Sequence, residues 1–467
     1  MKDYPDIRTL VDDVRKVATL AADGTCSIRD ASAFREGTID RLARTQALAV
    51  EPDVREAARH VIRAAAGALG CPLASIHDLY LAVGRGEAGG FTCPAMNLRA
   101  LAYDSARAAF RALRRLEAGA FLFEIARSEI GYTGQRPAEY SAALLAAAIK
   151  EGHGGPVFVQ GDHFQASAKA MKAQPQKEIQ VLRDLIVEAL EAGFYNIDID
   201  CSTLVDLSQP TIAEQQRMNC ELTADFTAFI REREPKGVTV SVGGEIGEVG
   251  GKNSTIEEQR AFIDGYRAAL AGLGADRAGI SKISVQTGTT HGGVVGPDGK
   301  VVQVDVDFDT LEKLSKGAIE EYGLGGAVQH GASTLPEELF VKFPQTRTIE
   351  IHLATEFQNI VYDRLPADLK KGIYGWLDEN AKDEKKAGMT DEQFYYKSRK
   401  KAIGPFKRDL HDLPAATLAE IGAALESKFE RLFRRLEIPG TAGVVARVVR
   451  PPDLARPAPE ALAAALA

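Results

Sequence analysis

The sequence predicts an α/β fold, a (β/α)8 TIM barrel with helical extensions at both ends. From about Ala74 onward, short β-type runs alternate with longer amphipathic stretches, which is the pattern of parallel strands joined by helices. Eight such runs lie between residues 74 and 365, the number that closes a barrel. Three histidines, His163, His291 and His330, each follow the end of one run, where barrel enzymes place their active sites.

Residues 1–73 are expected to form a helical N-terminal extension. Leu10, Val14 and Val17 recur at helical spacing, and Asp30 is a candidate N-cap for a helix that runs toward Leu48. The extension carries no catalytic constellation, which favours a role in packing or subunit contact.

The barrel is expected over residues 74–365. Its candidate strands are 91–97, 120–126, 157–162, 195–200, 238–243, 280–287, 326–330 and 348–353. The segments between them have apolar residues at i, i+3 and i+4, as amphipathic helices do. The candidate helices include 98–116, 177–192, 213–232, 257–273 and 310–322.

Residues 366–467 are expected to form a mostly helical C-terminal extension. The stretch 416–436 has helical periodicity. Residues 451–467 alternate Pro, Ala and Glu with few large apolar residues, which predicts a mobile tail.

The composition excludes several classes of protein. Of the 467 residues, 45% are hydrophobic and 26% charged, as in a globular enzyme, and the net charge of -8 offers no footprint for nucleic acid. Five scattered cysteines without a C-x-x-C pair indicate reduced thiols and a cytoplasmic protein. No signal peptide and no uncharged apolar run of about 20 residues is present, so no membrane contact is expected.

The three strand-end histidines predict a metal site. Three imidazoles from separate strands can hold one ion and leave a position open for substrate. Asp162 directly precedes His163, and both can face the barrel mouth only where the chain leaves the sheet, which the expected end of that strand permits. Asp162 is then a candidate acid/base beside the metal, with helix N-cap or loop bracket as the alternative.

Further polar residues follow other strands. Glu245 lies in a glycine-rich segment and suits metal ligation or support of a metal ligand, and Asp198 and Asp200 share a face of their strand. One of these two acids could cap the core without any chemistry. The segment from Gly331 to Ser333 precedes a helix and suits either phosphate binding or helix capping.

Taken in order, these strand-end motifs resemble those of the class II, metal-dependent ketose-bisphosphate aldolases, which include the fructose- and tagatose-bisphosphate enzymes. The resemblance covers residues 77–358, and each motif is short. The motifs are Phe91-Thr-Cys-Pro-Ala-Met-Asn97, Gly161-Asp162-His163, Ile197-Asp-Ile-Asp200-Cys-Ser, Gly244-Glu245-Ile-Gly247, Gly288-Thr-Thr-His291-Gly292 and His330-Gly-Ala-Ser333.

The resemblance implies a role for each matching residue. His163, His291 and His330 would hold a catalytic Zn²⁺, with Glu245 and Asp200 at a secondary metal position that a second divalent or a monovalent cation could occupy. Asp162 would move the proton of the hydroxyl at the cleaved carbon. The substrate and its phosphate would contact Asn97, Gly292, Ser333 and Thr355.

The implied reaction is retro-aldol cleavage of a phosphorylated ketose, such as fructose 1,6-bisphosphate, into dihydroxyacetone phosphate and an aldehyde through a zinc-stabilised enediolate. The alternatives are another ketose phosphate, a phosphate-free keto sugar, or a non-catalytic aldolase-like structural subunit. A structural subunit has no need of three strand-end histidines beside Asp162. Members of the family are usually dimers or tetramers, so the resemblance also implies a homodimer or homotetramer.

The sequence departs from the family pattern around the sugar and phosphate contacts. Gln160 stands where the family usually has His, His352 replaces an Asn of the last strand, and Ala354 replaces an Asp. Arg127 and Lys252 could supply anion contacts by another route, although both could equally be surface charges. The departures leave the metal ligands intact, so the metal-dependent step is better supported than the substrate.

Overall fold

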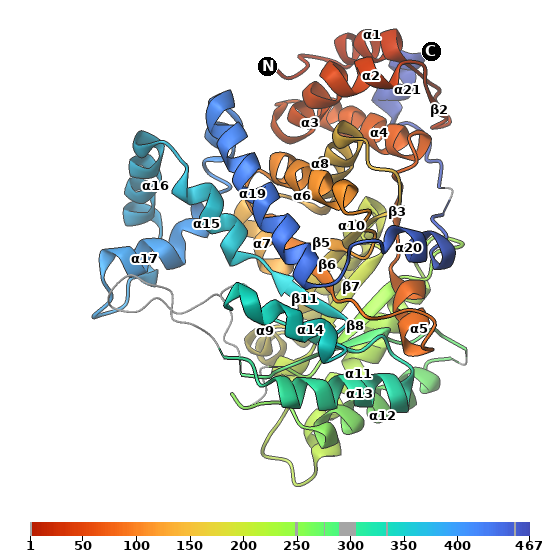
Figure 1. Cartoon of the computed structure of the whole chain (residues 1–467), viewed down its shortest axis with the longest axis vertical. Helices are drawn as coiled ribbons and strands as arrows, with labels where there is room; N and C mark the ends of the chain where they lie inside the picture. The colour runs from red at the N-terminus through yellow and green to blue at the C-terminus, as the bar shows by residue number, and fades with distance from the viewer. Residues whose placement is uncertain (1, 248–250, 275, 289–304, 333–334, 453) are drawn as a thin grey trace.

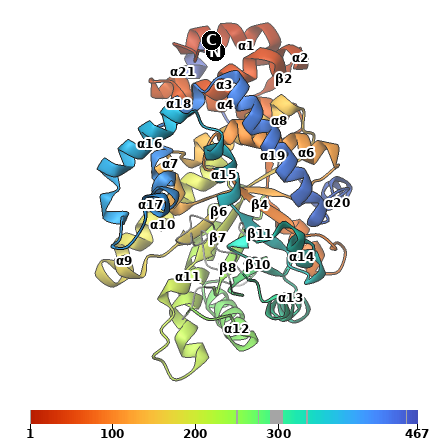
Figure 2. The ribbon, with the colours of Figure 1, turned by 60° about the vertical axis from the view of Figure 1, so that its left-hand side comes forward.

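The computed structural model describes residues 2–247, 251–274, 276–288, 305–332, 335–452 and 454–467. Eight parallel strands form the centre, each paired with the next along the chain, and the last pairs with the first. The strands are β4 (Cys93–Asn97), β5 (Leu122–Ala126), β6 (Val157–Gln165), β7 (Asn196–Asp200), β8 (Ser241–Glu245), β9 (Lys282–Val285), β10 (Ala327–Gln329) and β11 (Glu350–Leu353). The predicted closed barrel is confirmed (Figure 2).

Helices surround the barrel between successive strands, and the five helices named from the sequence are confirmed. These five are α6 (Ala102–Arg115), α10 (Pro175–Ala192), α11 (Ile212–Arg231), α12 (Ile256–Gly272) and α13 (Phe308–Tyr322). Two further long helices are α8 (Pro137–Glu151) and α15 (Thr355–Asp363). Shorter helices complete the connections: α5 (His77–Gly84), α7 (Arg127–Thr133), α9 (Ala168–Ala173), α14 (Lys342–Gln345), η2 (Ser202–Leu204) and η4 (Glu337–Val341).

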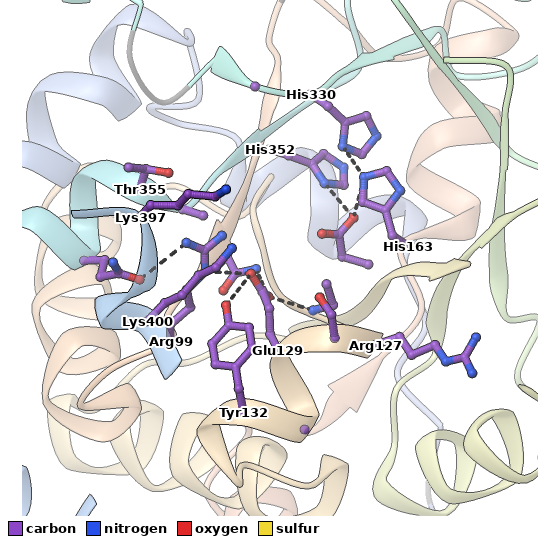
Figure 3. A pocket seen from close by; sticks show the side chains of 18 of the residues that line it. Arg99, Arg127, Glu129, Tyr132, His163, His330, His352, Thr355, Lys397 and Lys400 are labelled. Atoms are coloured by element: carbon purple, nitrogen blue, oxygen red, sulfur yellow. Dashed lines mark hydrogen bonds and ion pairs between the residues drawn. The ribbon is translucent and has the colours of Figure 1, made fainter. Parts of the chain in front are cut away.

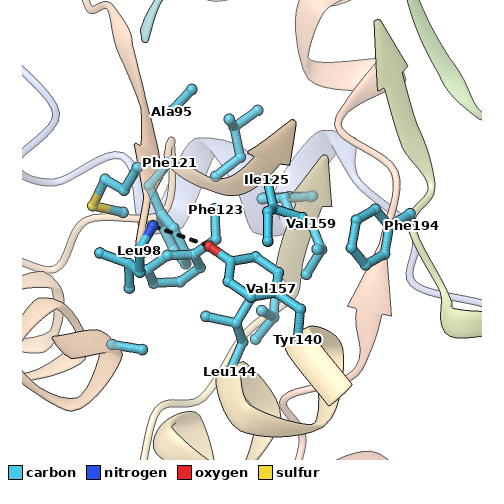
Figure 4. Packing of buried hydrophobic residues seen from close by; sticks show 14 of the residues in the cluster. Ala95, Leu98, Phe121, Phe123, Ile125, Tyr140, Leu144, Val157, Val159 and Phe194 are labelled. Atoms are coloured by element: carbon cyan, nitrogen blue, oxygen red, sulfur yellow. Dashed lines mark hydrogen bonds between the residues drawn. The ribbon is translucent and has the colours of Figure 1, made fainter. Parts of the chain in front are cut away.

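The core between the helices and the barrel combines aliphatic and aromatic side chains. Tyr140 of α8 lies against β5 and β6 among Phe121, Phe123 and Val159, all fully buried (Figure 4). Its hydroxyl donates to the Glu124 carbonyl at 2.7 Å and accepts from the Leu98 amide at 3.2 Å. A buried phenol needs such partners, and here they connect α8 to the middle of β5 and to the residue that follows β4.

The N-terminal extension consists of helices and one hairpin, and its helices α3 and α4 pack on α8. Its elements are α1 (Ile7–Val17), β1 (Ala18–Leu20), β2 (Cys26–Ile28), α2 (Ala31–Ala33), η1 (Phe34–Thr38), α3 (Ile39–Leu48), α4 (Pro52–Ala68) and β3 (Leu73–Ala74), which pairs with β6. Asp30 caps the Ala33 amide at 2.9 Å, as predicted. The antiparallel hairpin was not predicted, because three-residue strands carry too little periodicity to be read.

The C-terminal extension forms a second helical layer. Its elements are α16 (Ala367–Asn380), η5 (Lys382–Glu384), α17 (Asp391–Ser398), η6 (Arg399–Ala402), α18 (Lys407–His411), α19 (Ala415–Arg435), α20 (Ala442–Val448) and α21 (Glu460–Leu466). The expectation of a mobile tail is wrong for α21, which packs on α1 and α4 beside the N-terminus (Figure 1). Leu462 is fully buried there, and Arg15 donates to the Leu466 carbonyl at 2.9 Å.

Candidate active site

A cavity of about 1140 Å³ opens at the C-terminal ends of the barrel strands. Strands, connecting loops and the C-terminal extension all contribute to its wall. Of the predicted site residues, Asn97, Asp162, His163, His330 and Thr355 line it. His291, Gly292 and Ser333 lie outside the described residues.

A bulge in β6 brings Asp162 and His163 to the same cavity. The pairing of β6 with β7 shifts between Gly161 and Phe164, and His163 has a φ of 41°. The strand does not end at Asp162, as the sequence analysis assumed, but runs on to Gln165. A bulge can turn neighbouring side chains, which in a regular strand point to opposite faces, toward the same side. Both residues therefore face the cavity as expected, but because of a bulge within the strand and not because the strand ends.

His163 and His330 point toward one another from opposite sides of the barrel mouth (Figure 3). His163 Nε2 lies 3.0 Å from His330 Nδ1 and 3.7 Å from Asp162 Oδ1. These three residues form a group whose donor atoms could hold a metal ion. Two nitrogen ligands of one tetrahedral zinc lie roughly 3.3 Å apart, because each Zn–N bond is about 2.0–2.1 Å. The spacing and the donor types therefore fit zinc.

The outer nitrogens of these two imidazoles face carboxylates. His163 Nδ1 lies 3.1 Å from Asp200 Oδ2, and His330 Nε2 lies 3.4 Å from Glu245 Oε2. Asp200 also accepts hydrogen bonds from Gln165 at 2.6 Å and Ser202 at 2.7 Å, which fix its position. A carboxylate on the far nitrogen orients a metal-binding imidazole and makes it a stronger ligand. This geometry gives Asp200 and Glu245 a supporting place beside the ligands.

The electrostatics of this group favour a bound cation. Burial alone would lower the pKa of His163, but the carboxylates of Asp162, Asp200 and Glu245 outweigh it and hold the pKa well above its usual value. Burial would raise the pKa of Asp200, yet its hydrogen bonds to His163, Ser202 and Gln165 lower it. A pocket that stabilises a protonated imidazole so strongly would stabilise a divalent ion in the same field.

His352 is a further site residue, which in the sequence stands out only as a departure from the family pattern. Its Nδ1 lies 2.8 Å from Glu124 Oε2 and 3.1 Å from Asp162 Oδ1, and its Nε2 lies 2.7 Å from Glu350 Oε1. Despite burial, Glu124 and Asp162 raise its pKa well above the usual value. The sequence did contain a signal for this role. His352 lies two residues after the inward-facing Glu350, so the two side chains point to the same face of the strand.

Below His352 the barrel interior is filled by a buried charge network. Lys282, fully buried, donates to Glu350 at 2.5 Å, Asp198 at 3.0 Å and Gln160 at 2.7 Å. A buried ammonium is tolerated only when so paired. Of the two acids on β7, Asp198 is therefore the one that lies in the core, which was one of the two roles considered from the sequence. A Cβ at Gly243 would approach Asp198 Oδ1 to 2.3 Å, so the pair needs glycine at this position.

The carboxyl groups of this network have divergent pKa values. Burial raises the pKa of Glu124 to about 8, with Asp162 adding to the effect, and burial raises that of Asp198 to about 6. For Glu350 burial acts in the same direction, but Lys282 and His352 overcome it and lower the pKa to about 2. Glu124 therefore releases its proton at a higher pH than Asp198 or Glu350 does.

The opposite wall of the cavity is basic (Figure 3). It is lined by Arg99, Arg127, Lys386, Lys397 and Lys400, together with the phenols of Tyr132 and Tyr396. All three lysines come from the C-terminal extension. Over the described ranges, none of the three has a hydrogen-bond or ion-pair partner for its ammonium group. Burial and then Arg99 lower the pKa of Lys400 by more than Glu129 and Glu384 raise it.

Arg127 and Lys252, the two residues predicted to contact an anion, are both paired with carboxylates. Arg127 lines the cavity but is held by Glu178 at 2.5 Å and by the Gln165 carbonyl at 2.6 Å. Lys252 pairs with Glu258 at 2.8 Å and is not part of the cavity wall. Arg99 is bound by Glu129 at 2.6 Å, and Glu129 also accepts from Asn97. The lysines of the C-terminal layer, which carried no motif, are the ones left to meet an anion.

The fold is a (β/α)8 barrel, and its mouth carries a group of residues that could hold a metal ion. The sequence model of the class II fructose-bisphosphate aldolases matches residues 81–409. The chain therefore belongs to the class II fructose-bisphosphate aldolase family. A search of curated proteins finds no match.

Solved structures share the barrel at low sequence identity. A probable tagatose 6 phosphate kinase from Sinorhizobium meliloti 1021 is 18% identical with a TM-score of 0.51, covering 80% of this chain and 97% of that one. A fructose-bisphosphate aldolase from Campylobacter jejuni is 17% identical with a TM-score of 0.46, over 78% and 94% of the two chains. A fructuronate-tagaturonate epimerase from Cohnella laeviribosi is 13% identical with a TM-score of 0.48, over 84% and 86%. At these identities the likeness concerns the fold alone.

The helices give no sign of a membrane span. Among those that the structure describes, none combines the length and the apolar character that crossing a bilayer requires.

Proposed function

We propose that this protein is a zinc-dependent aldolase that cleaves a phosphorylated ketose, such as fructose 1,6-bisphosphate, into dihydroxyacetone phosphate and an aldehyde. The observation that carries the proposal is the placement of Asp162 beside the facing nitrogens of His163 and His330, in a cavity with a basic far wall. Family membership over residues 81–409 supports the same reaction class.

His163 and His330 would hold the zinc ion, while Asp200 and Glu245 orient their imidazoles from the outer nitrogens. The predicted third histidine, His291, lies outside the described residues. When bound, the ion supplies Lewis-acid polarisation of the ketose carbonyl.

Asp162 is the group placed to move the proton. In the cleavage direction its carboxylate takes the proton from the hydroxyl on the carbon that becomes the aldehyde, and in synthesis it returns that proton. The carboxylate is buried at the cavity floor, where water competes little with a substrate hydroxyl. His352 Nδ1, 3.1 Å from Asp162 Oδ1, holds the carboxylate in place and is itself anchored by Glu350.

The basic wall supports an anionic substrate. Arg99, Lys397 and Lys400 line the same cavity as the histidine group, so a ketose held by its carbonyl at one end can place a phosphate at the other. Hydrogen bonds to charged groups contribute about 1.5–3 kcal/mol each. That is enough to make the phosphate a main determinant of binding.

The proposal is tested by measuring aldol cleavage across a panel of ketose bisphosphates, ketose monophosphates and unphosphorylated ketoses. We expect turnover of at least one phosphorylated ketose and its loss in a His163→Ala variant. His153→Gln, a buried histidine away from the cavity, serves as the matched control and should retain activity. Cleavage that survives His163→Ala undiminished would remove the basis of the proposal.

A further inference from the structure

A second cavity, of about 420 Å³, lies on the side of the barrel away from the active-site mouth. It is enclosed by the hairpin turn before β2, by α4, by the start of β7 and by the C-terminal segment before α21. Tyr195, which immediately precedes β7, marks this as the N-terminal end of the strands. A volume of this size is within the range of small-molecule sites.

Two guanidinium groups converge in this cavity. Arg63 of α4 donates to the Glu191 carbonyl at 3.0 Å and to the Tyr195 hydroxyl at 3.1 Å, and Arg456 donates to the same carbonyl. Across the described ranges, no carboxylate is within ion-pair distance of either arginine. Their shared carbonyl belongs to the last turn of α10, and a helix end offers only about half a unit of negative charge.

The surroundings of Arg63 disfavour its charged form. Burial, with the neighbouring charge of Arg456, lowers the pKa of Arg63 to about 10. Two like charges held together in a partly desolvated pocket are costly unless an anion joins them. Arginine pairs of this kind suit a planar carboxylate or a phosphate, which accept several hydrogen bonds at once.

A third polar residue lines the same cavity. His60, one turn before Arg63 on α4, lines the cavity, and its Nε2 is buried without a hydrogen-bond partner in the described part of the chain. Burial and Arg63 lower the pKa of His60, so the ring is neutral at physiological pH. A neutral imidazole can donate one hydrogen bond to an anion that the two arginines hold.

The C-terminal segment closes this cavity in a fixed place. A Cβ on Gly24 would fall 1.9 Å from the Arg456 carbonyl, so the hairpin turn and the segment are in close contact. The Ala458 amide donates to the Ala22 carbonyl at 2.9 Å, next to the docked helix α21. Packing of the segment against the hairpin turn therefore fixes the position of Arg456 in the cavity.

We propose that this cavity is an anion-binding site for a small metabolite that carries a phosphate or carboxylate group. The anionic group binds between Arg63 and Arg456, with the His60 ring beside it. The remainder of the ligand lies against the apolar wall, which is formed by Ala64, Ala68, Pro72, Leu73, Leu145, Pro452 and Leu454. Because the ligand would join α4 to the C-terminal segment, its binding stabilises the contact between the two extensions. The site is independent of the aldolase reaction proposed above.

Cys26 can report on ligand binding because it lines the cavity. It is half-buried, whereas the other four cysteines are buried. The rate of its alkylation by a neutral maleimide is followed by peptide mapping on the full chain. Titrations with inorganic phosphate and with acetate are run at constant ionic strength. At an anion concentration about ten times its Kd, alkylation should slow about ten-fold, since only unoccupied protein reacts.

Arg63→Met and Arg456→Met should abolish this protection while leaving aldolase activity unchanged. Arg447→Met, an exposed arginine on α20, is the control and should behave as the wild type. Protection by phosphate or by acetate identifies which anionic group the site prefers. Absence of protection by both anions, or equal protection in the two cavity variants, overturns the proposal. Phosphate bound at the active site would not alter Cys26, so the two sites are told apart.

Discussion

The two ends of the active-site cavity differ in charge and in the parts of the chain that build them. The histidine end is made by strands β6, β7, β8, β10 and β11 and is rich in carboxylates. The basic end is made by Arg99 and by lysines of the C-terminal extension. One end fits a cation and the other an anion, so a substrate with a polarised carbonyl and a distant phosphate satisfies both.

The two ends of the cavity also differ in how strongly the fold constrains their side chains. Side chains on barrel strands are fixed by the hydrogen-bonded sheet, and the chemistry of a barrel enzyme resides at those ends. The lysines of residues 386–400 belong to a layer added after the barrel, where substitution does not disturb the sheet. We expect the histidine end to determine the reaction and the basic end to determine the substrate.

Replacing the acid/base breaks the histidine end most severely. Asp162→Asn removes the proton acceptor but keeps the shape, and general acid–base catalysis contributes about 10²- to 10⁴-fold. We expect kcat to fall within that range while the zinc content measured by atomic absorption stays that of the wild type. An unchanged kcat would make Asp162 a loop bracket and not the acid/base.

Removing the carboxylate behind His163 tests the support of the metal ligands. Asp200→Asn takes away the charge on the outer nitrogen, and changes of this kind cost roughly 10- to 100-fold in metal affinity. Competition with a fluorescent zinc chelator measures the loss. Asp206→Asn, an exposed acid in the loop after β7, is the control. Equal affinity in the two variants would contradict the orienting role of Asp200.

The basic end is tested by removing one ammonium group. For Lys400→Met we expect KM for a phosphorylated ketose to rise roughly ten-fold, the equivalent of one charged hydrogen bond. The KM for an unphosphorylated ketose should not change. Lys371→Met, an exposed lysine of α16 in the same layer, is the matched control. A fall in kcat without a change in KM would place Lys400 in the chemistry instead.

The smallest expected effect concerns acid stability, which depends on residues away from both ends. Burial holds the pKa of His153 at about 4 in the folded chain, against about 6.5 when unfolded. Its contribution to stability is complete above pH 6.5 and is lost as the pH falls toward 4. Urea unfolding at pH 7 and pH 5 should show a loss of about 1–2 kcal/mol from this group.

The comparison with His153→Gln isolates that contribution. The variant should lose less stability than the wild type between the two pH values. Parallel losses in both proteins would mean that His153 is not neutral when folded.

The sequence predicted the parts of the site that lie on periodic elements. All eight strands, and the places of Asp162, His163 and His330 at the barrel mouth, follow from alternating β-type and helical runs and from the position of each residue within its run. The bulge after Gly161 could not be foreseen, since local register depends on the neighbouring strand. His352 was visible as a strand residue, but its contact with Asp162 depends on packing across the barrel interior.

The basic wall was beyond the reach of sequence patterns. Lys397 and Lys400 lie in a short helical stretch rich in lysine, which on its own indicates a solvated surface. Only the folding of the C-terminal layer over the cavity gives these side chains a binding role. The mobile tail was mispredicted for a similar reason, because small alanine-rich helices are stabilised by their docking partner and not by their own composition.

The most direct test of the central claim is the dependence of cleavage on zinc. Metal is removed with a chelator, the absence of zinc is verified, and the rate of ketose phosphate cleavage is followed as zinc is restored. The account predicts almost complete loss of activity and its recovery at stoichiometric zinc, with no recovery in His163→Ala. Full activity in the metal-free protein would contradict it.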